Sequence, residues 1–256
     1  MIPSKIFFKP EIYNSIDWAK ENINNAPDGS VFMADAHKFT RGRQNRSWLF
    51  DKGQLVITLL LKPNILNILN ILKNEDLGLR LNNLNMAISL AILENLEKFN
   101  IKLKWPNDFN YDNFKVAGIL SQAIWQDNKI SGIIFGFAIN TNNLIKNNNL
   151  NFNAISLREI SGDIINKENL FKEILVSCDR YYKIWLNLEF ENIFNIWKEK
   201  LNYLINKNIL IHKFDGEKIT GKFIGVLENG DIVLEFENKI QEAISFNIVE
   251  NILVKK

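Results

Sequence analysis

The chain has 256 residues, 46% of them hydrophobic, which is enough to bury the core of one large domain and a small second one. Its formal net charge of +2 is close to balance, so charge alone does not indicate a polyanionic partner. The single cysteine, Cys178, excludes an intramolecular disulfide and a zinc site built from cysteines, and it fits a reducing compartment.

The amino-terminal segment, residues 1–15, reads MIPSKIFFKPEIYNS, and its charges come too early for a signal peptide. No apolar run approaches the ~20 residues that a membrane helix needs. We therefore expect a cytoplasmic protein with no membrane contact.

The next part of the chain predicts a sheet with packed helices. Leucines and isoleucines from Leu77 to Ile92 recur at helical spacing, which predicts a helix whose apolar face packs on a sheet. In chain order, the predicted elements are a helix capped by Ser15 that ends near Asn25, a turn at Asp28-Gly29, a strand over 31–36, a buried strand over 55–61, and a helix from Leu77 to about Phe99.

The stretch KWPNDFNYDNFKVAGIL, residues 104–120, brings a carboxylate, an amide and an ammonium close together in sequence. Pro106 restricts Trp105 to an extended conformation and cannot donate a ladder hydrogen bond. The simplest interpretation is a β-hairpin whose connection presents Asn107, Asp108 and Lys115 at one end of a sheet. Such a cluster suits an anionic substrate, and Asp108 is suited to act on a proton or an amine.

The second half of the chain predicts strands, helices and then strands again. Two antiparallel strands are expected over 116–125 and 130–139, followed by an asparagine-rich tract over 140–153 that is either a mobile loop or a surface insertion. Helical patterns cover 167–188 and 190–201. From Ile209 onward, short apolar runs alternate with Asp215-Gly216 and Asn229-Gly230, and the second pair predicts a two-residue hairpin. These runs predict a small all-β unit.

Residues 40–48, TRGRQNRSW, place three arginines around a glycine in an expected loop. Guanidinium groups bind phosphate and carboxylate bidentately and stay charged at any relevant pH. Gly42 lets the backbone approach a ligand closely. Taken alone, the segment is equally consistent with a basic surface loop or a non-specific RNA contact.

Together, the two stretches resemble biotin protein ligases. The KWPND sequence, with a lysine eleven residues after its first and V-A-G-I-L behind it, is similar to the family signature KWPND…K-L/V-A-G-I-L. Residues 40–48 resemble the family's biotin-binding loop, G-R-G-R-x-G-R-x-W, with Thr40 and Asn45 in place of two glycines. Asn45 tolerates a left-handed backbone, but the β-branched Thr40 tolerates positive φ poorly, so we expect a differently shaped turn there.

The resemblance implies contacts with biotin and biotinyl-adenylate from Ser15, Ile16, Asp17, His37, Arg41, Gly42, Arg43, Trp48, Lys115 and Gly118. Ser15 matches the family's S-T-N segment, whereas Ile16 and Asp17 depart from it, and Asp17 is equally consistent with an ordinary helix start. His37 replaces a glutamine that meets the ureido ring. An imidazole can still make hydrogen bonds, although a solvent-facing strand residue is an equal alternative. A ligand lying flat on the strand would explain Gly118.

The resemblance also implies nucleotide contacts from Asn107, Gly136, Asn140 and Ala154, and catalytic roles for Lys115, Arg41, Arg43 and Asp108. Residues 136–140 match the family's G-x-G-I/L-N except that Ala138 replaces a glycine, and residues 154–157 resemble an A-T-S-L segment that closes over the nucleotide. The asparagine-rich tract would then be a lid. No residue cluster has metal-ligand spacing and no P-loop is present, so ATP with Mg²⁺ would be held in another way.

The implied fold is α+β. A class II synthetase-like, biotin–lipoate ligase catalytic domain over residues 1–206, a mixed sheet with helices, would precede an SH3-like β-barrel over residues 207–256. The implied reaction activates biotin with ATP as biotinyl-5′-AMP and transfers it to a lysine of the biotin carboxyl carrier protein of acetyl-CoA carboxylase. Some relatives add an amino-terminal DNA-binding domain; we expect none here and therefore no specific DNA binding. The resemblance is compatible with a homodimer.

Two alternatives remain open. A lipoate ligase would share the fold and the adenylate chemistry, although its signatures differ from the two stretches above. A non-catalytic RNA-binding module would use the arginines on phosphate and would show salt-sensitive RNA affinity. Near-neutral net charge argues mildly against the second alternative.

Overall fold

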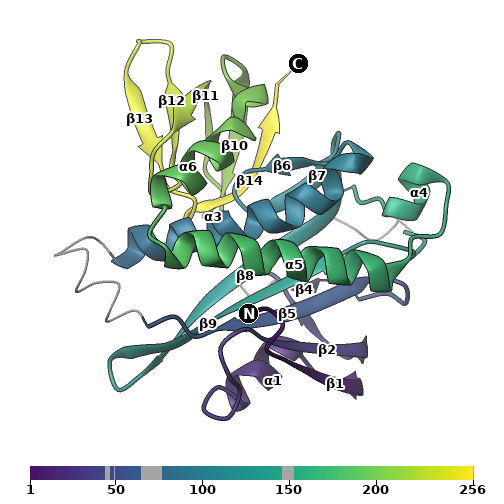
Figure 1. Cartoon of the computed structure of the whole chain (residues 1–256). Coiled ribbons are helices and arrows are strands. Elements are labelled where there is room, and N and C mark those ends of the chain that lie inside the picture. The colour runs from purple at the N-terminus through teal and green to yellow at the C-terminus, as the bar shows by residue number, and fades with distance from the viewer. Residues whose placement is uncertain (44–46, 49, 65–76, 146–152, 256) are drawn as a thin grey trace.

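The computed structural model describes residues 1–43, 47–48, 50–64, 77–145 and 153–255, with only the backbone of Arg41 and Ser47. The predictions for Asn45 and for residues 146–152 of the asparagine-rich tract lie outside the described residues. Two sheets dominate the rest of the chain (Figure 1).

The main sheet has seven strands in the order β1-β2-β5-β9-β8-β7-β6. Only β1 and β2 run parallel, and the other neighbours are antiparallel. The strands are β1 (Lys5–Ile12), β2 (Ser30–His37), β5 (Leu55–Leu61), β6 (Lys102–Lys104), β7 (Asp108–Tyr111), β8 (Phe114–Gln126) and β9 (Lys129–Ile139). Every residue of β5 is buried, because this central strand is covered on both faces.

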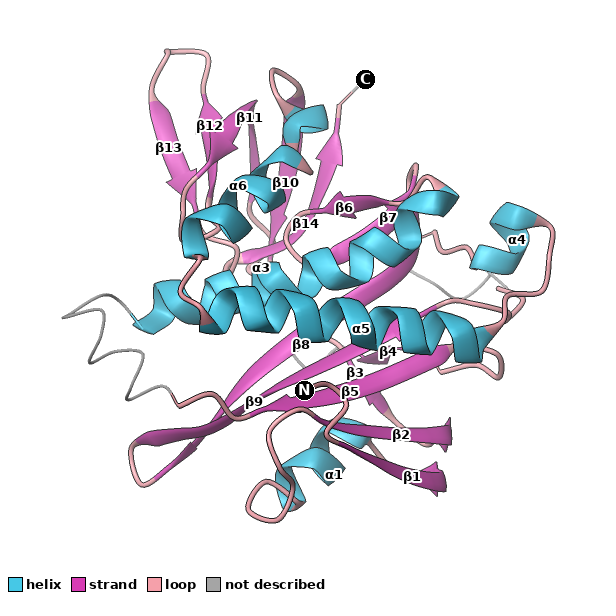
Figure 2. Ribbon diagram, in the orientation of Figure 1, coloured by secondary structure: helices cyan, strands magenta, loops and turns pink. Residues whose placement is uncertain are grey.

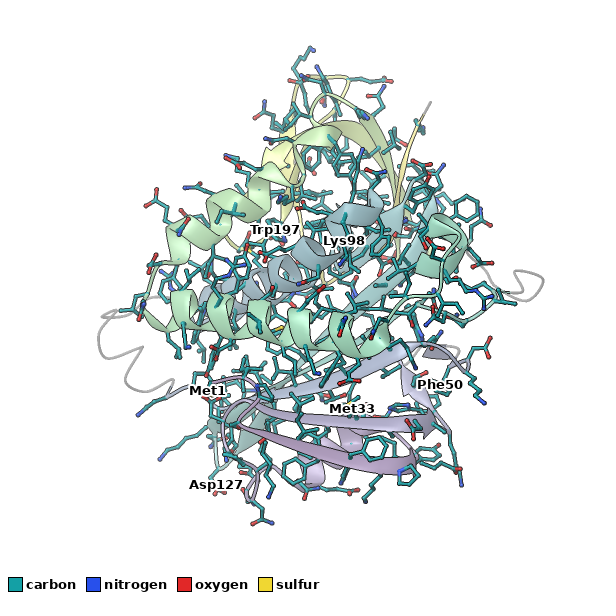
Figure 3. The ribbon with its side chains drawn as sticks, turned by 45° about the vertical axis from the view of Figure 1, so that its right-hand side comes forward. Met1, Met33, Phe50, Lys98, Asp127 and Trp197 are labelled. Carbon is teal, nitrogen blue, oxygen red and sulfur yellow. The ribbon has the colours of Figure 1, made fainter. Side chains whose placement is uncertain are left out.

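Helices cover the two faces of this sheet unequally. The long helices α3 (Leu77–Leu96) and α5 (Lys167–Leu186) pack together on one face, and α6 (Phe190–Glu199) contacts both. Trp197 of α6 is buried where α6 faces α3 (Figure 3). The short helix α1 (Ser15–Glu21) lies on the opposite face, where Ile16 and Ala19 pack against Phe32, Leu60 and Ile134. A second short helix, α4 (Leu157–Ser161), begins with a capping box formed by Ser156 and Glu159.

The carboxyl-terminal residues form a separate five-stranded antiparallel sheet in the order β13-β12-β11-β10-β14 (Figure 2). Its strands are β10 (Asn208–Lys213), β11 (Lys218–Val226), β12 (Ile232–Glu235), β13 (Gln241–Ile244) and β14 (Val249–Val254). The buried side chains of this unit, such as Phe223 and Leu234, join the same hydrophobic cluster as α3. The α+β prediction, a mixed sheet with helices followed by an all-β unit, is confirmed.

Several elements lie close to where the sequence predicts them, although the helix predicted to end near Phe99 ends at Leu96. The strand over 55–61, the turn at Asp28-Gly29, the helix that starts at Leu77 and the two long strands before Asn140 are all present. The helices predicted from Lys167 and Phe190 are present too, two residues shorter at their ends. None of the helices in the described part of the chain is long and apolar enough to cross a membrane.

Other predictions were wrong in detail. The first helix ends at Glu21, and its cap is Asn14, whose side-chain oxygen accepts hydrogen bonds from the backbone of Ile16 and Asp17. The turn at Asn229-Gly230 is longer than a two-residue hairpin, because Leu227 N donates to Asp231 O with three residues between them. Strand β1 was not predicted, because its alternation is irregular and most of it is exposed.

The stretch over 101–125 is a three-stranded meander rather than one hairpin. Its first turn is at Trp105–Asn107, with a cis Trp105–Pro106 peptide, and its second follows Tyr111. Short β3 (Thr40–Arg41) and β4 (Ser47–Trp48) pair antiparallel at the base of the arginine loop. Thr40 does not adopt positive φ, because it lies in β3, and its hydroxyl donates to Trp48 O.

Candidate active site

Small residues gather at the centre of the main sheet on the face that carries α1. Gly118 of β8, Ala138 of β9 and Val56 of β5 lie side by side in register, and the next row holds Leu120, Gly136 and Thr58. Side chains alternate between the faces of a strand, so these residues share the face of Leu120 and Ile134, which pack against α1. The two glycines and the alanine leave this face low in side-chain volume.

The two glycines have different neighbours. A Cβ atom at Gly136 would lie 2.8 Å from Cδ1 of Ile16, so Gly136 gives α1 room to approach the sheet. A Cβ atom at Gly118 would lie 3.2 Å from Cε of Lys115 and 3.3 Å from Oδ1 of Asp108. The sheet therefore supports a helix at Gly136 and an ion pair at Gly118.

That ion pair joins β7 and β8. Nζ of Lys115 lies 2.6 Å from Oδ1 of Asp108, and the two side chains are 21% and 22% exposed. Phe109 pairs with Ala117 whereas Asn110 pairs with Lys115, so Val116 is an extra residue in β8. Because this bulge changes the alternation of side chains, Lys115 shares a face with Gly118 although they are three residues apart.

Arg43 reaches the same region from the arginine loop. Its Nη1 donates to Oδ1 of Asn107 over 3.4 Å, and Asn107 in turn donates from Nδ2 to Ile119 O over 2.7 Å. Arg43 and Lys115 thus contact two consecutive residues, Asn107 and Asp108. The backbone of Arg41 lies in β3, and Gly42 separates it from Arg43; the role of the Arg41 side chain stays a prediction.

Trp48 lies next to the ion pair. The ammonium of Lys115 is 5.1 Å from the centroid of its ring, within cation–π range. Its Nε1 donates to Oε1 of Gln54 over 3.4 Å. Trp48 therefore lies beside the catalytic candidates, as expected for a wall of the site.

Sequence reasoning missed Lys104, the first residue of KWPND. Lys104 pairs with Asp108 across β6 and β7. Burial lowers the pKa of its ammonium, the carboxylate of Asp108 opposes this, and the positive charge of Lys115 adds to it. Two ammonium groups, those of Lys104 and Lys115, thus interact with Asp108, and the position of Lys104 in the motif was the available signal.

A chain of amides connects Trp48 to the end of β9. Gln54, which is buried, donates from Nε2 to Oδ1 of Asn140 over 2.9 Å, and Asn140 donates from Nδ2 to Lys115 O over 3.4 Å. Ala154 forms an isolated bridge with Lys115, so it also lies beside this strand end. Gln54 was missed as well, although a polar residue at the start of an apolar run was a usable signal.

The residues predicted to hold the ureido ring, Ser15 and Asp17, lie in different environments. The hydroxyl of Ser15 accepts a hydrogen bond from Thr58 Oγ1 over 2.7 Å, and both residues are buried on the α1 face of the sheet. Asp17 lies in an ion pair with Lys20 at 3.6 Å, with its side chain 36% exposed. Thr58 is a third residue that sequence reasoning missed, because one hydroxyl in an apolar strand resembles a core residue.

His37 lies at the end of β2 and is buried, so the solvent-facing alternative is wrong. Its ring is 5.1 Å from the ring of Phe50, which lies near the same end of the sheet (Figure 3). Neither ring nitrogen has a hydrogen-bond partner within the described part of the chain. Burial lowers the pKa of His37 to about 4, so the imidazole is neutral at pH 7.

This burial predicts an acid-sensitive stability. Between pH 6.5 and 4 the unfolded chain protonates His37 while the folded chain does not, so the free energy of unfolding falls as the pH falls. We expect a loss of about 2 kcal/mol from this residue at pH 5 relative to pH 7. Urea unfolding of the wild type and His37→Gln at both pH values measures it. Equal losses in the two proteins would contradict the assignment.

Among the described residues, no group of three or more histidine, cysteine, aspartate or glutamate side chains could hold a metal ion. The site as described is a sheet face with small residues, rimmed by Lys115, Asp108, Arg43 and Trp48. Such an arrangement can bind a flat apolar group next to an anion.

Comparisons with known proteins identify the family of the chain. A family model described as "Biotin/lipoate A/B protein ligase family" matches residues 10–140. The chain is 27% identical over 231 residues to "Bifunctional ligase/repressor BirA" of Bacillus spizizenii, covering 88% of this chain and 67% of the relative. It is 27% identical over 128 residues to "Biotin--[acetyl-CoA-carboxylase] ligase" of Paracoccus denitrificans, covering 47% and 49%.

Among solved structures, the fold is similar to that of a biotin protein ligase from Aquifex aeolicus in complex with biotin and ATP. The TM-score is 0.79 with 23% sequence identity, and the match covers 98% of this chain and 100% of that one. At this identity the likeness shows that the fold is shared.

Proposed function

Because the chain belongs to the biotin/lipoate A/B protein ligase family, we propose that it is a biotin protein ligase, which activates biotin with ATP and transfers it to a lysine of a carrier protein. The observation that carries this proposal is the contact of Lys115 and Arg43 with the consecutive residues Asp108 and Asn107, beside Gly118. We assign the chemistry to residues 1–206 and treat residues 207–256 as a second domain.

The first step joins two anions. A carboxylate oxygen of biotin attacks the α-phosphorus of ATP, the bond to the β-phosphate oxygen breaks, and pyrophosphate leaves. Lys115 and Arg43 offset the repulsion between the reactants and the charge that builds up in the transition state. At an effective dielectric near 20, two unit charges about 4 Å apart attract by about 4 kcal/mol. Arg41 is assigned to the same task on the resemblance of its loop.

The second step consumes the mixed anhydride. The amine of the acceptor lysine attacks the acyl carbon, the bond from that carbon to the phosphate oxygen breaks, and AMP leaves. The attacking amine must lose a proton, and Asp108, the half-buried carboxylate paired with Lys115, is assigned as the group that orients it and accepts this proton. Binding of the acyl group on a covered face limits attack by water.

Ring binding uses the small-residue face of the sheet. Gly118 and Ala138 form its floor, Trp48 a wall, and the hydroxyl of Ser15 at the α1 end a hydrogen-bonding group for the ureido ring. His37 is buried, with neither ring nitrogen partnered within the described residues, so a ureido group could satisfy it. Ile16 packs on Gly136, so its contribution is to shape the α1 end.

The resemblance implies nucleotide contacts from Asn107, Asn140, Ala154 and Gly136. Three of these lie around the strand end that carries Lys115, whereas Gly136 lies under Ile16, so we give it a packing role toward this site. Magnesium is assigned as the complex with ATP, and Asn107 as the polar group that supports the nucleotide or its metal.

The acceptor is assigned as the biotin carboxyl carrier protein of acetyl-CoA carboxylase. The name of the relative in Paracoccus denitrificans supports this choice, because that protein is called a ligase for acetyl-CoA carboxylase. A homodimer is compatible with the family resemblance.

The test is ATP–pyrophosphate exchange with the purified chain. We expect exchange that depends on biotin and does not occur with lipoate, which the description of the family also allows. Incubation with a carrier domain should then release AMP and add one biotin. Exchange with lipoate but not with biotin would overturn the biotin assignment. Absence of exchange, with salt-sensitive RNA binding, would favour the non-catalytic alternative.

A further inference from the structure

The C-terminal module, residues 208–254 with strands β10–β14, contacts the arginine loop. Arg43 donates from Nη2 to the carbonyl oxygen of Phe246 over 2.5 Å, and its guanidinium carbon lies 5.3 Å from the centroid of the Phe214 ring. Phe214 directly follows β10, and Phe246 lies between β13 and β14. Arg43 and Phe246 are 203 residues apart in sequence, so only the folded module can supply this contact.

Both phenylalanines are held by the module's own hydrogen bonds. The backbone N–H of Phe214 donates to Ile248 O over 3.0 Å, and that of Phe246 donates to Oδ1 of Asp231 over 3.3 Å. The module is also attached to the WPND turn, because Nε1 of Trp105 donates to Gly230 O over 2.8 Å. Phe214 and Phe246 therefore keep a fixed position relative to Asn107 and Asp108.

The contact reduces the conformational entropy that Arg43 loses when a ligand binds. An arginine side chain loses rotamer freedom when it binds an anion, and a guanidinium that is already ordered loses less. A ring face attracts the guanidinium within about 6 Å of its centroid without taking an anion's place. Phe214 can therefore order Arg43 beside Asn107 before the substrate arrives.

We propose that Phe214 is a positioning residue for the ligase reaction, which holds the Arg43 guanidinium beside Asn107 so that it meets the anionic group of the substrate. The inference rests on the proposed function, which assigns that anion to Arg43. It adds a residue of the C-terminal module to the site, acting through Arg43.

The test compares Phe214→Leu and Phe214→Tyr in biotin-dependent ATP–pyrophosphate exchange. We expect Phe214→Leu to raise KM by about fivefold for the substrate whose anionic group Arg43 binds. The change in kcat should be smaller. Phe214→Tyr, which keeps the ring face, should stay near the wild-type value. Phe236→Leu, a half-buried phenylalanine of the same module, is the matched control and should leave KM unchanged.

A double-mutant cycle with Arg43→Ala separates positioning from general damage. If Phe214 acts through Arg43, Phe214→Leu should have little further effect on kcat/KM once Arg43 is removed. An equal loss in both backgrounds would overturn the proposal, and so would a Phe214→Tyr variant as impaired as Phe214→Leu.

Failure of the proposed function would be visible separately, as a wild-type protein without biotin-dependent exchange. The same cycle is then measured on the midpoint of thermal unfolding, which does not need catalysis. Non-additive shifts would still show that Phe214 and Arg43 act as a pair. Additive shifts would remove the coupling and the inference with it.

Discussion

Replacing Lys115 by alanine is expected to lower biotin-dependent ATP–pyrophosphate exchange by about 100- to 1000-fold, the loss typical of removing one group that stabilises transition-state charge. The ammonium lies 2.6 Å from Asp108 and next to Gly118, and the proposed function places the reacting carboxylate and phosphate at this point. The measurement is kcat/KM for exchange, with the unfolding midpoint as a check on folding. Because both side chains of the pair are about one-fifth exposed, water can solvate Asp108 after the substitution, so the fold should persist.

Lys129→Ala is the matched control, because Lys129 is an exposed lysine at the start of the neighbouring strand β9. It removes the same charge from the same sheet and should leave exchange unchanged. A folded Lys115→Ala protein with wild-type exchange would remove Lys115 from the mechanism and leave the convergence of cations on Asp108 without a catalytic role.

The sequence predicts those parts of the site that depend on interactions between residues close together in the chain. Strand β5 and helix α3 were predictable because their burial follows a periodic pattern within one segment. The proximity of Lys115 and Asp108 was predictable from the motif. Their shared face with Gly118 was not, because it depends on the bulge at Val116, which is a mismatch between two strands rather than a property of either.

Longer-range contacts were less accessible still. Thr58 and Gln54 enter the site only because β5 pairs with β9 and faces α1. The contact of Arg43 with Phe246 joins segments that no local pattern relates. The cap of α1 is a local feature that the sequence nevertheless leaves ambiguous, because asparagine and serine both favour this position. The side chain of Asn14 caps α1 and leaves the hydroxyl of Ser15 to Thr58.

Gly118→Val tests whether the ion pair of Lys115 and Asp108 depends on the absence of a side chain at position 118. A Cβ at Gly118 would lie 3.3 Å from both Nζ of Lys115 and Oδ1 of Asp108, so the added methyl groups must displace the pair. We expect exchange to fall about 100-fold, as for a misplacement of about 1 Å at a reacting centre, and KM for biotin to rise because the floor of the site is filled. Valine suits a strand and Gly118 does not have positive φ, so the unfolding midpoint should change little.

Gly225→Val provides the control for this prediction. Gly225 also lies in a strand, β11, without positive φ, and a Cβ there would meet no atom within 4 Å. The same substitution should therefore leave exchange at the wild-type level. If Gly118→Val kept full exchange, the pair could move without loss, and the position of Lys115 above this glycine would not matter for catalysis. If instead both valine variants lost exchange equally, the effect would belong to the strands in general and not to the ion pair.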